Sequence, residues 1–328
     1  KSVTFMSLLG LINSHNAIIN ADKLEVGGID LLTNQKKQLS KIRGKIASMV
    51  FQDSMTSFDP LFTVGYQIIE TILTHKDTNK EEAFKEALQL LKKVEIQNPE
   101  KVINYYPHQL SGGMLQRAMI AMALSCEPKL LIADEPTTAL DVTVQAQILQ
   151  LIKDLQLEKN MSLIMITHDL GVIAETVDRV IVMYGGEIQE VASVEKLFKK
   201  PLHPYTKALM NSIPHMERKT KRLIALKGMV PSILEMGDGC KFCSRFDPEE
   251  CPCMGTKENQ ELFEAETPCT NVNKGILKIV QVPSKAPNFG YKGRILFSTT
   301  GTKRHRHLMH YVRPGSRRAL TFRFGRES

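Results

Sequence analysis

The sequence predicts an α/β fold built on a parallel β-sheet, because two short apolar runs each end in polar residues. Residues 130–133 and residues 162–167 are the two runs. Apolar runs of this length, bounded by turn-forming residues, are typical of strands buried on both faces of a sheet. Asp134 and Glu135 follow the first run, and His168 follows the second. Ligands of open α/β sheets bind at the carboxyl ends of the strands, so these residues mark a candidate site.

The other elements are predicted in chain order. An apolar strand precedes Gln52, and residues 65–125 are expected to be mainly helical. Within that region, residues 78–94 form an amphipathic helix with one apolar face: Ala83, Phe84, Ala87, Leu88, Leu91 and Val94. Residues 179–184 and 187–190 are two further strands around a Gly185-Gly186 turn, which favours a hairpin.

The pair Asp134-Glu135 has the chemistry of a phosphate-handling site. A carboxylate at a strand end can hold Mg²⁺, and the neighbouring carboxylate can orient and deprotonate an attacking water. Taken alone, the same pattern is also explained by a strand that runs into a capped helix, and that interpretation is the more common one. The surrounding motifs decide between the two.

A glycine-containing helix start precedes this strand. Ser111 is a good N-cap, and Gly112 and Gly113 leave backbone N–H groups open to an anion. His168, like Glu135, follows a core strand, although a single histidine is more often structural than catalytic.

Over residues 1–205 the chain resembles the ATP-binding subunit of ABC (ATP-binding cassette) transporters. Five motifs occur in the family's order: Gln52 of the Q-loop, the signature loop Leu110–Met114, the Walker B strand Leu130–Glu135, the D-loop Ala139–Asp141 and the switch histidine His168. The resemblance implies a P-loop NTPase fold, with a RecA-like core and a helical subdomain at about 65–125. It also assigns Ser111, Gly112, Gly113, Asp134 and Asp141 to the nucleotide site.

The chain begins on Lys1-Ser2-Val3-Thr4. By resemblance, these residues are the end of a Walker A loop: Lys1 binds phosphate, Ser2 binds Mg²⁺ together with Gln52 and Asp134, and Val3 belongs to the nucleotide-contacting set. A Walker A loop needs glycines ahead of the lysine so that backbone amides can surround the phosphates. We therefore expect this sequence to be a fragment of a longer gene product, truncated within Walker A, that binds ATP poorly as written.

Several segments resemble the oligopeptide, dipeptide and nickel importer branch of the family. They are residues 105–109, residues 134–145 and residues 201–209. The last segment resembles the start of a C-terminal extension, which we place at residues 206–275. A plain linker followed by a helix is the alternative interpretation of that segment.

Five of the six cysteines cluster in this extension. Stable disulfides are rare in the cytosol, so a dense cluster indicates a metal site. The resemblance implies a [4Fe–4S] cluster held by Cys240, Cys253 and Cys269, with Cys243 or Cys251 in place of the family's second cysteine, where this chain has Phe246. Four thiolates also suit Zn²⁺, and reduced cysteines without metal remain the third alternative.

The net charge of +8 lies at the C-terminus. Residues 283–328 hold 11 Lys and Arg residues against the single acidic Glu327. A patch for nucleic acid or anionic lipid is one interpretation, but we favour a disordered basic tail over residues 276–328, and no nucleic-acid partner. No apolar run approaches the 18 to 20 residues needed to cross a bilayer.

The resemblance implies an ATPase that energises peptide import, with Glu135 as the general base and His168 contacting the γ-phosphate. Its implied partners are a second ATPase subunit, two membrane permease subunits and, indirectly, an extracytoplasmic peptide-binding protein. Its implied location is the cytoplasmic face of the cell membrane, as a peripheral protein. Three alternatives stay open: a soluble ABC ATPase acting on nucleic acid or ribosomes, nickel rather than peptide import, and a non-catalytic interaction subunit.

Overall fold

The computed structural model describes most of the first 212 residues and a few short segments beyond them. The described residues are 1–12, 19–21, 24–32, 35–138, 140–212, 230–231, 241–242, 245, 294–297, 309–312 and 322–324. The chain divides into two compact units. One consists of residues 2–10 and 26–176, and the other of residues 1, 11–25 and 177–328. Each unit is described by itself.

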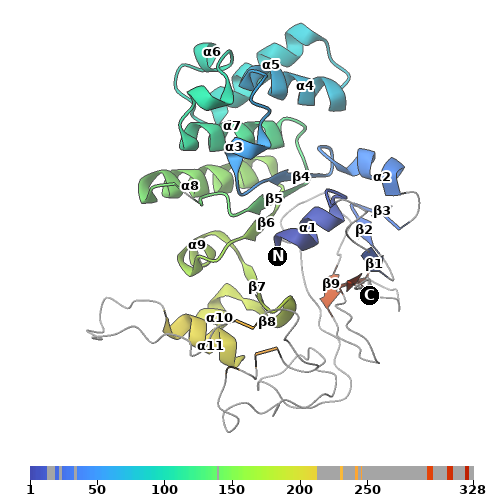
Figure 1. Cartoon of the computed structure of the whole chain (residues 1–328), viewed down its shortest axis with the longest axis vertical. Coiled ribbons are helices and arrows are strands. Elements are labelled where there is room, and N and C mark those ends of the chain that lie inside the picture. The colour runs from blue at the N-terminus through green and yellow to red at the C-terminus, as the bar shows by residue number, and fades with distance from the viewer. Residues whose placement is uncertain are drawn as a thin grey trace. The chain divides into compact units, whose positions relative to one another are not determined.

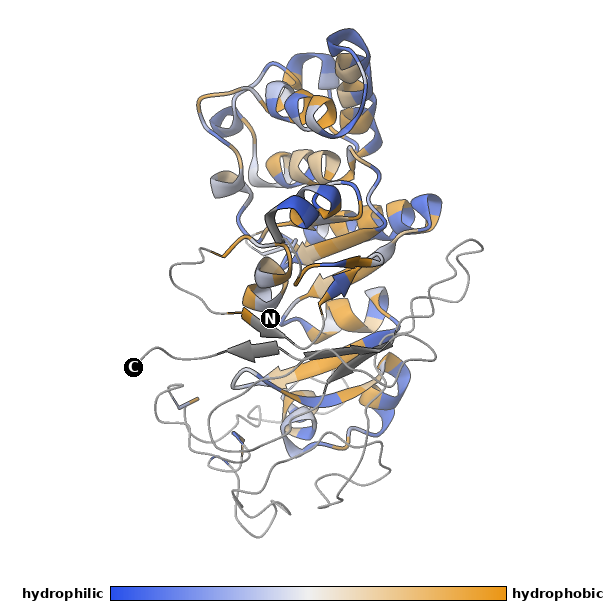
Figure 2. Ribbon diagram, turned by 90° about the vertical axis from the view of Figure 1, so that its right-hand side faces the viewer, coloured by the Kyte–Doolittle hydropathy of each residue, from blue (hydrophilic) through white to orange (hydrophobic). Residues whose placement is uncertain are grey.

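A three-stranded parallel sheet lies at the centre of the unit formed by residues 2–10 and 26–176. Its strands are β4 (Ala47–Val50), β5 (Leu130–Asp134) and β6 (Ser162–Ile166), in the order β4-β5-β6. Val50 pairs with Ala133, and Asp134 pairs with Ile166, so the three strands end at one edge. This confirms the α/β fold class and the three strands predicted around residues 130–133, residues 162–167 and ahead of Gln52. Figure 2 shows the strands of this unit as mainly hydrophobic.

Helices connect the parallel strands, as parallel pairing requires. Helix α8 (Val142–Lys159) joins β5 to β6, and α9 (Leu170–Thr176) follows β6 (Figure 1). Asp141 is the N-cap of α8, and Asn160 ends the helix in the left-handed conformation. Ahead of the sheet lie α1 (Ser2–Leu8), β3 (Ile29–Asp30) and α2 (Gln35–Ile42).

The long connection between β4 and β5 is helical. It contains α3 (Ser54–Ser57), α4 (Val64–His75), α5 (Lys80–Lys93), α6 (Pro99–Val102), the 3-10 turn η1 (Pro107–Gln109) and α7 (Gly112–Leu124). Its core is fully buried around Ile68, Ile72, Leu91 and Leu115. At Gly65, the second residue of α4, a Cβ would lie 2.3 Å from the carbonyl oxygen of Ile103, so this position requires glycine.

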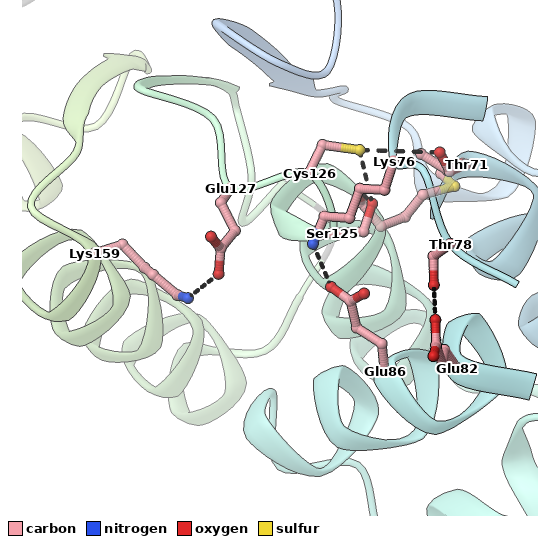
Figure 3. A network of polar contacts seen from close by, with 10 residues as sticks. Thr71, Lys76, Thr78, Glu82, Glu86, Ser125, Cys126, Glu127 and Lys159 are labelled. Carbon is pink, nitrogen blue, oxygen red and sulfur yellow. Dashed lines mark hydrogen bonds and ion pairs between the residues drawn. The ribbon is translucent and has the colours of Figure 1, made fainter. Parts of the chain in front are cut away.

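A polar network joins the C-terminal end of α4, helix α5 and the turn after α7 (Figure 3). Lys76 pairs with Glu86, and the Cys126 thiol lies 3.9 Å from the Thr71 carbonyl oxygen. Ser125 lies 3.6 Å from the Cys126 sulfur. These contacts tie the end of α4 to α5 and to the turn after α7.

The other unit is organised around a hairpin of β7 (Arg179–Tyr184) and β8 (Glu187–Ser193), followed by α10 (Val194–Lys199) and α11 (Pro204–Asn211). Gly185 and Gly186 both have positive φ, as the predicted two-residue hairpin turn requires. Phe242 is 1% exposed and packs with Tyr184 and Tyr205 at ring centroid distances of 5.2 and 5.1 Å. Burial in this aromatic cluster raises the pKa of Tyr205.

Four short strands complete the pairing within these residues, in two antiparallel pairs. β1 (Ile19–Ala21) pairs with β11 (Phe322–Phe324), and β9 (Arg294–Phe297) pairs with β10 (Met309–Val312). The two-residue strand β2 (Glu25–Val26) pairs with β3. The last three strands of the chain fall inside the tail for which the sequence predicts disorder, and the other residues of 276–328 lie outside the described part.

Candidate nucleotide-binding site

Three strands deliver polar side chains to one edge of the sheet. Gln52 lies two residues beyond the end of β4, Glu135 follows β5 directly, and His168 lies two residues beyond β6. The backbone N–H of Glu135 donates to the carbonyl of Ile166 at 2.8 Å, which continues the pairing of β5 with β6 past the last strand residue. The sheet thereby places all three side chains together.

The Glu135 carboxylate is the centre of this group. Its Oε2 accepts hydrogen bonds from Gln52 Nε2 and from Thr138 Oγ1, both at 2.9 Å, and its Oε1 lies 3.1 Å from His168 Nδ1. An ionised carboxylate only accepts hydrogen bonds, so Nδ1 of His168 carries the hydrogen in this contact. The Glu135 side chain is 17% exposed, whereas that of His168 is 73% exposed. The carboxylate is therefore held in one orientation and can still be reached by water.

Asp134 forms a second group with the start of α1. Its side chain is buried, and Oδ1 accepts a hydrogen bond from Ser2 Oγ at 2.8 Å across 132 positions of sequence. A hydroxyl and a carboxylate oxygen this close suit Mg²⁺, which takes oxygen ligands in octahedral geometry. The donor set therefore fits the ion that the sequence implies. Lys1 precedes α1 and is exposed, and the side chain of Val3 is also exposed.

The signature residues form a third group, packed on α8. Ser111 caps α7, and its Oγ accepts from the Met114 backbone N–H at 3.3 Å. A Cβ on Gly113 would lie 2.9 Å from Val144 Cγ1, so glycine is needed for this close approach. Asp141 caps α8, and its Oδ1 accepts from the Val144 backbone N–H at 3.0 Å. The structure thus brings the N-termini of α7 and α8 side by side.

The cysteines predicted to hold a metal, Cys240, Cys243, Cys253 and Cys269, lie outside the described residues, and so does Cys251. Over the part of the chain that the structure describes, there is no group of three or more His, Cys, Asp or Glu side chains that could hold a metal ion. The [4Fe–4S] cluster therefore stays a prediction.

Two contacting residues, Thr138 and Arg117, were not predicted from the sequence. Thr138 lies three residues after Glu135, and its N–H donates to the Glu135 carbonyl at 3.1 Å, which turns the hydroxyl back onto the carboxylate. A Thr at this spacing after a strand-end acid was the available signal. Nothing comparable marks Arg117, because a single Arg in a helix pattern is usually exposed.

Comparison with known proteins places these motifs in a family. A profile described as "ABC transporter" matches residues 1–138, and one described as "Oligopeptide/dipeptide transporter, C-terminal region" matches residues 189–253. Within the described residues, no helix combines the length and the apolar character needed to cross a membrane.

Individual relatives agree with these matches. The chain is 49% identical to the oligopeptide transport ATP-binding protein AppD of Bacillus subtilis over 75% of each chain. It is 47% identical to the dipeptide transport ATP-binding protein DppD of Escherichia coli over 73% of each chain. Among solved structures, cbiO1 of Clostridium perfringens, part of the ABC transporter complex cbiONQ, is similar with a TM-score of 0.51 and 25% identity. That match covers 61% of this chain and 74% of cbiO1. The chain therefore belongs to the ABC transporter ATPases, in the branch of the oligopeptide and dipeptide transport ATP-binding proteins.

Proposed function

We propose that this protein hydrolyses ATP to energise the import of oligopeptides or dipeptides, with Glu135 as the general base. The observation that carries the proposal is the arrangement around Glu135, whose carboxylate is held by Gln52, Thr138 and His168 beside the Ser2–Asp134 pair. The similarity to oligopeptide and dipeptide transport proteins supports the choice of peptide. Nickel import and action on nucleic acid or ribosomes are the alternatives that the test must separate.

In the proposed reaction, Glu135 takes a proton from water while the water oxygen attacks the γ-phosphorus of ATP. The bond between that phosphorus and the oxygen bridging to ADP breaks, and ADP leaves with that electron pair. Mg²⁺, bound through Ser2 and Asp134 with Gln52 nearby, would neutralise phosphate charge. Lys1 adds a positive charge at the start of α1, and His168 contacts the γ-phosphate. Phosphoryl transfer depends mainly on such positioning and electrostatic stabilisation.

The signature group acts on a second subunit in this proposal. Ser111, Gly112 and Gly113 open the N-terminus of α7, where unpaired N–H groups and the helix dipole favour an anion. They face the ATP of a partner ATPase subunit, homologous or identical, and Asp141 of the neighbouring helix lies at the same seam. Closure of the two subunits on ATP completes both sites, and opening releases the products.

An exposed apolar surface formed by Leu61, Phe62 and Tyr66 supports a membrane-protein partner. Leu61 is 78% exposed, and the stacked rings of Phe62 and Tyr66, 4.8 Å apart, are 43% and 46% exposed. Exposed apolar groups of this kind mark interaction sites. We assign this surface to the two permease subunits, which would hold the protein at the cytoplasmic face of the membrane as a peripheral subunit and link it indirectly to an extracytoplasmic peptide-binding protein.

The experiment uses the protein co-expressed with two permease subunits of a peptide importer. ATPase activity is measured alone, with permeases in lipid vesicles, and with DNA or ribosomes. Stimulation by permeases together with a peptide-loaded binding protein supports the proposal, and stimulation by a nickel-loaded one instead changes the substrate. Stimulation by DNA or ribosomes, without an effect of the permeases, overturns it.

The cysteine segment adds a cofactor to the proposal. Cys240, Cys243, Cys253 and Cys269 would hold a [4Fe–4S] cluster, and the match of residues 189–253 to the C-terminal region of oligopeptide/dipeptide transporters, where the resemblance implies such a cluster, supports this. Anaerobic purification followed by iron, sulfide and zinc analysis, with a visible absorption spectrum, tests it. A brown protein with about four irons per chain is expected. Stoichiometric zinc, or a colourless protein without metal, overturns the cluster.

A further inference from the structure

Helices α7 and α8 are joined by a buried charged side chain one turn beyond their N-termini. Gly113 of α7 packs against Val144 of α8. Four residues later on α7, Arg117 Nη2 donates a hydrogen bond to Oε1 of Gln147, three residues after Val144, at 3.1 Å. Steps of three and four residues keep to one face of a helix, so both contacts belong to a single seam.

Arg117 is a buried charged side chain, and its hydrogen bonds hold it in place at this seam. The residue is 8% exposed, and a guanidinium stays charged at any pH that a folded protein tolerates. A buried charge is costly unless its hydrogens meet acceptors. Besides Gln147, Nη1 donates to the Val94 carbonyl at 2.8 Å and to Glu95 Oε2 at 3.0 Å. Each acceptor therefore matters to the placement of the side chain.

The contacts of Arg117 fasten three elements together. Val94 is the C-cap of α5, and Glu95 follows it with a φ of 58° in the left-handed region. Gln147 lies in α8, which begins just after Asp141. The signature helix is thus tied to the end of α5 on one side and to α8 on the other.

We infer that Arg117 and Gln147 are positioning residues that hold the signature loop, Ser111–Gly113, and Asp141 in fixed mutual geometry. The inference rests on the proposed function, in which both loops meet the partner subunit's nucleotide. Because they start two helices joined along one seam, they approach that nucleotide as a rigid unit. Loosening the seam leaves each subunit's own nucleotide contacts intact and slows the step that needs both loops in place.

The test replaces the acceptor, since truncating the buried Arg117 endangers folding. Gln147 is exposed, so Gln147→Leu removes the carbonyl oxygen without opening the core. Gln150→Leu is the matched control: Gln150 lies on the same helix, is exposed, and donates to Asp154 of α8 at 2.8 Å. Gln147→Glu keeps an acceptor for the guanidinium and serves as the conservative variant.

All variants are made in the full-length protein, and kcat, KM for ATP and the unfolding midpoint are measured. We expect Gln147→Leu to lower kcat by roughly tenfold, the size expected for a modest hydrogen bond to a charged group, with KM unchanged and only a small fall in the midpoint, because Arg117 keeps its two acceptors at Val94 and Glu95. Gln150→Leu and Gln147→Glu should retain wild-type kcat within about twofold.

Three results would overturn the inference: an unchanged kcat in Gln147→Leu, an equal loss of kcat in Gln150→Leu, or a loss of kcat that comes with a raised KM or with a midpoint so low that the variant is partly unfolded at the assay temperature. A wild-type protein that does not hydrolyse ATP would instead contradict the proposed function, so the two failures are distinguishable.

Discussion

Replacing Glu135 with Gln should separate its catalytic role from its structural one. The carboxylate receives two hydrogen bonds on Oε2, from Gln52 and Thr138, and one contact on Oε1, from His168. A Gln side chain of the same shape can place its carbonyl oxygen at the Oε2 position and keep both donors. Its NH₂ group then faces His168, whose ring can accept in the other tautomer.

The size of each effect follows from this geometry. All three contacts can be re-formed, so the free energy of unfolding should change by less than about 1 kcal/mol, and ATP binding and pairing of the subunits should persist. The amide cannot take a proton from water. Loss of a general base costs about 10² to 10⁴ in rate, or about 3 to 5 kcal/mol in the activation free energy.

The assay is steady-state ATP hydrolysis by the full-length Glu135→Gln protein, together with ATP binding by equilibrium titration and size-exclusion chromatography with ATP. Glu100→Gln is the control, because Glu100 is exposed and pairs only at the surface with Lys92, where an ion pair contributes little. Hydrolysis within about tenfold of wild type would refute the assignment of Glu135 as the base. So would a loss of ATP binding that matches the loss of turnover.

Three further predictions address the signature loop and the helical connection. Gly113→Ala should reduce kcat because its Cβ would lie 2.9 Å from Val144 Cγ1. Adding Val144→Ala should restore part of the lost kcat. If the double variant is as slow as Gly113→Ala alone, this contact is not what requires glycine. Burial, followed by the charge of Lys45, lowers the pKa of His75, so the folded state favours neutral imidazole and loses stability as pH falls below the ordinary value of 6.5. The stability advantage of wild type over His75→Gln in urea unfolding should therefore shrink between about pH 7.5 and pH 5.5, whereas a pH-independent difference would contradict the assignment. Burial also raises the pKa of the Cys126 thiol (Figure 3), so peptide mapping should find it alkylated by iodoacetamide more slowly than free glutathione, and an equal rate would count against this.

The strands and the fold class were predictable because β4 and β5 are almost wholly buried and β6 is at least partly buried. Residues 130–133 and 163–166 are apolar enough to indicate strands without any knowledge of their neighbours. Helix boundaries were less predictable. The amphipathic pattern covers residues 78–94, but the helix begins at Lys80, since Asn79 provides the capping box, and ends at Lys93. The order of the strands depends on crossovers that a single sequence does not show.

Side chains at the ends of strands were predictable, whereas their contacts were not. Asp134, Glu135 and His168 could be placed at one edge of a sheet from the sequence, and Gln52 joined them through the resemblance. The bond from Thr138 to Glu135 depends on the path of a turn, and the bonds of Arg117 depend on how α7 packs on α8. Contacts of this kind come from tertiary packing, which local patterns do not determine.

The backbone at Glu135 has a φ of 46°, which is unfavourable for any residue that carries a Cβ. Glycine would relieve that conformation, but Glu135→Gly would also remove the acceptor that holds Gln52, Thr138 and His168. The backbone conformation at this position therefore favours glycine, whereas the proposed chemistry needs a carboxylate.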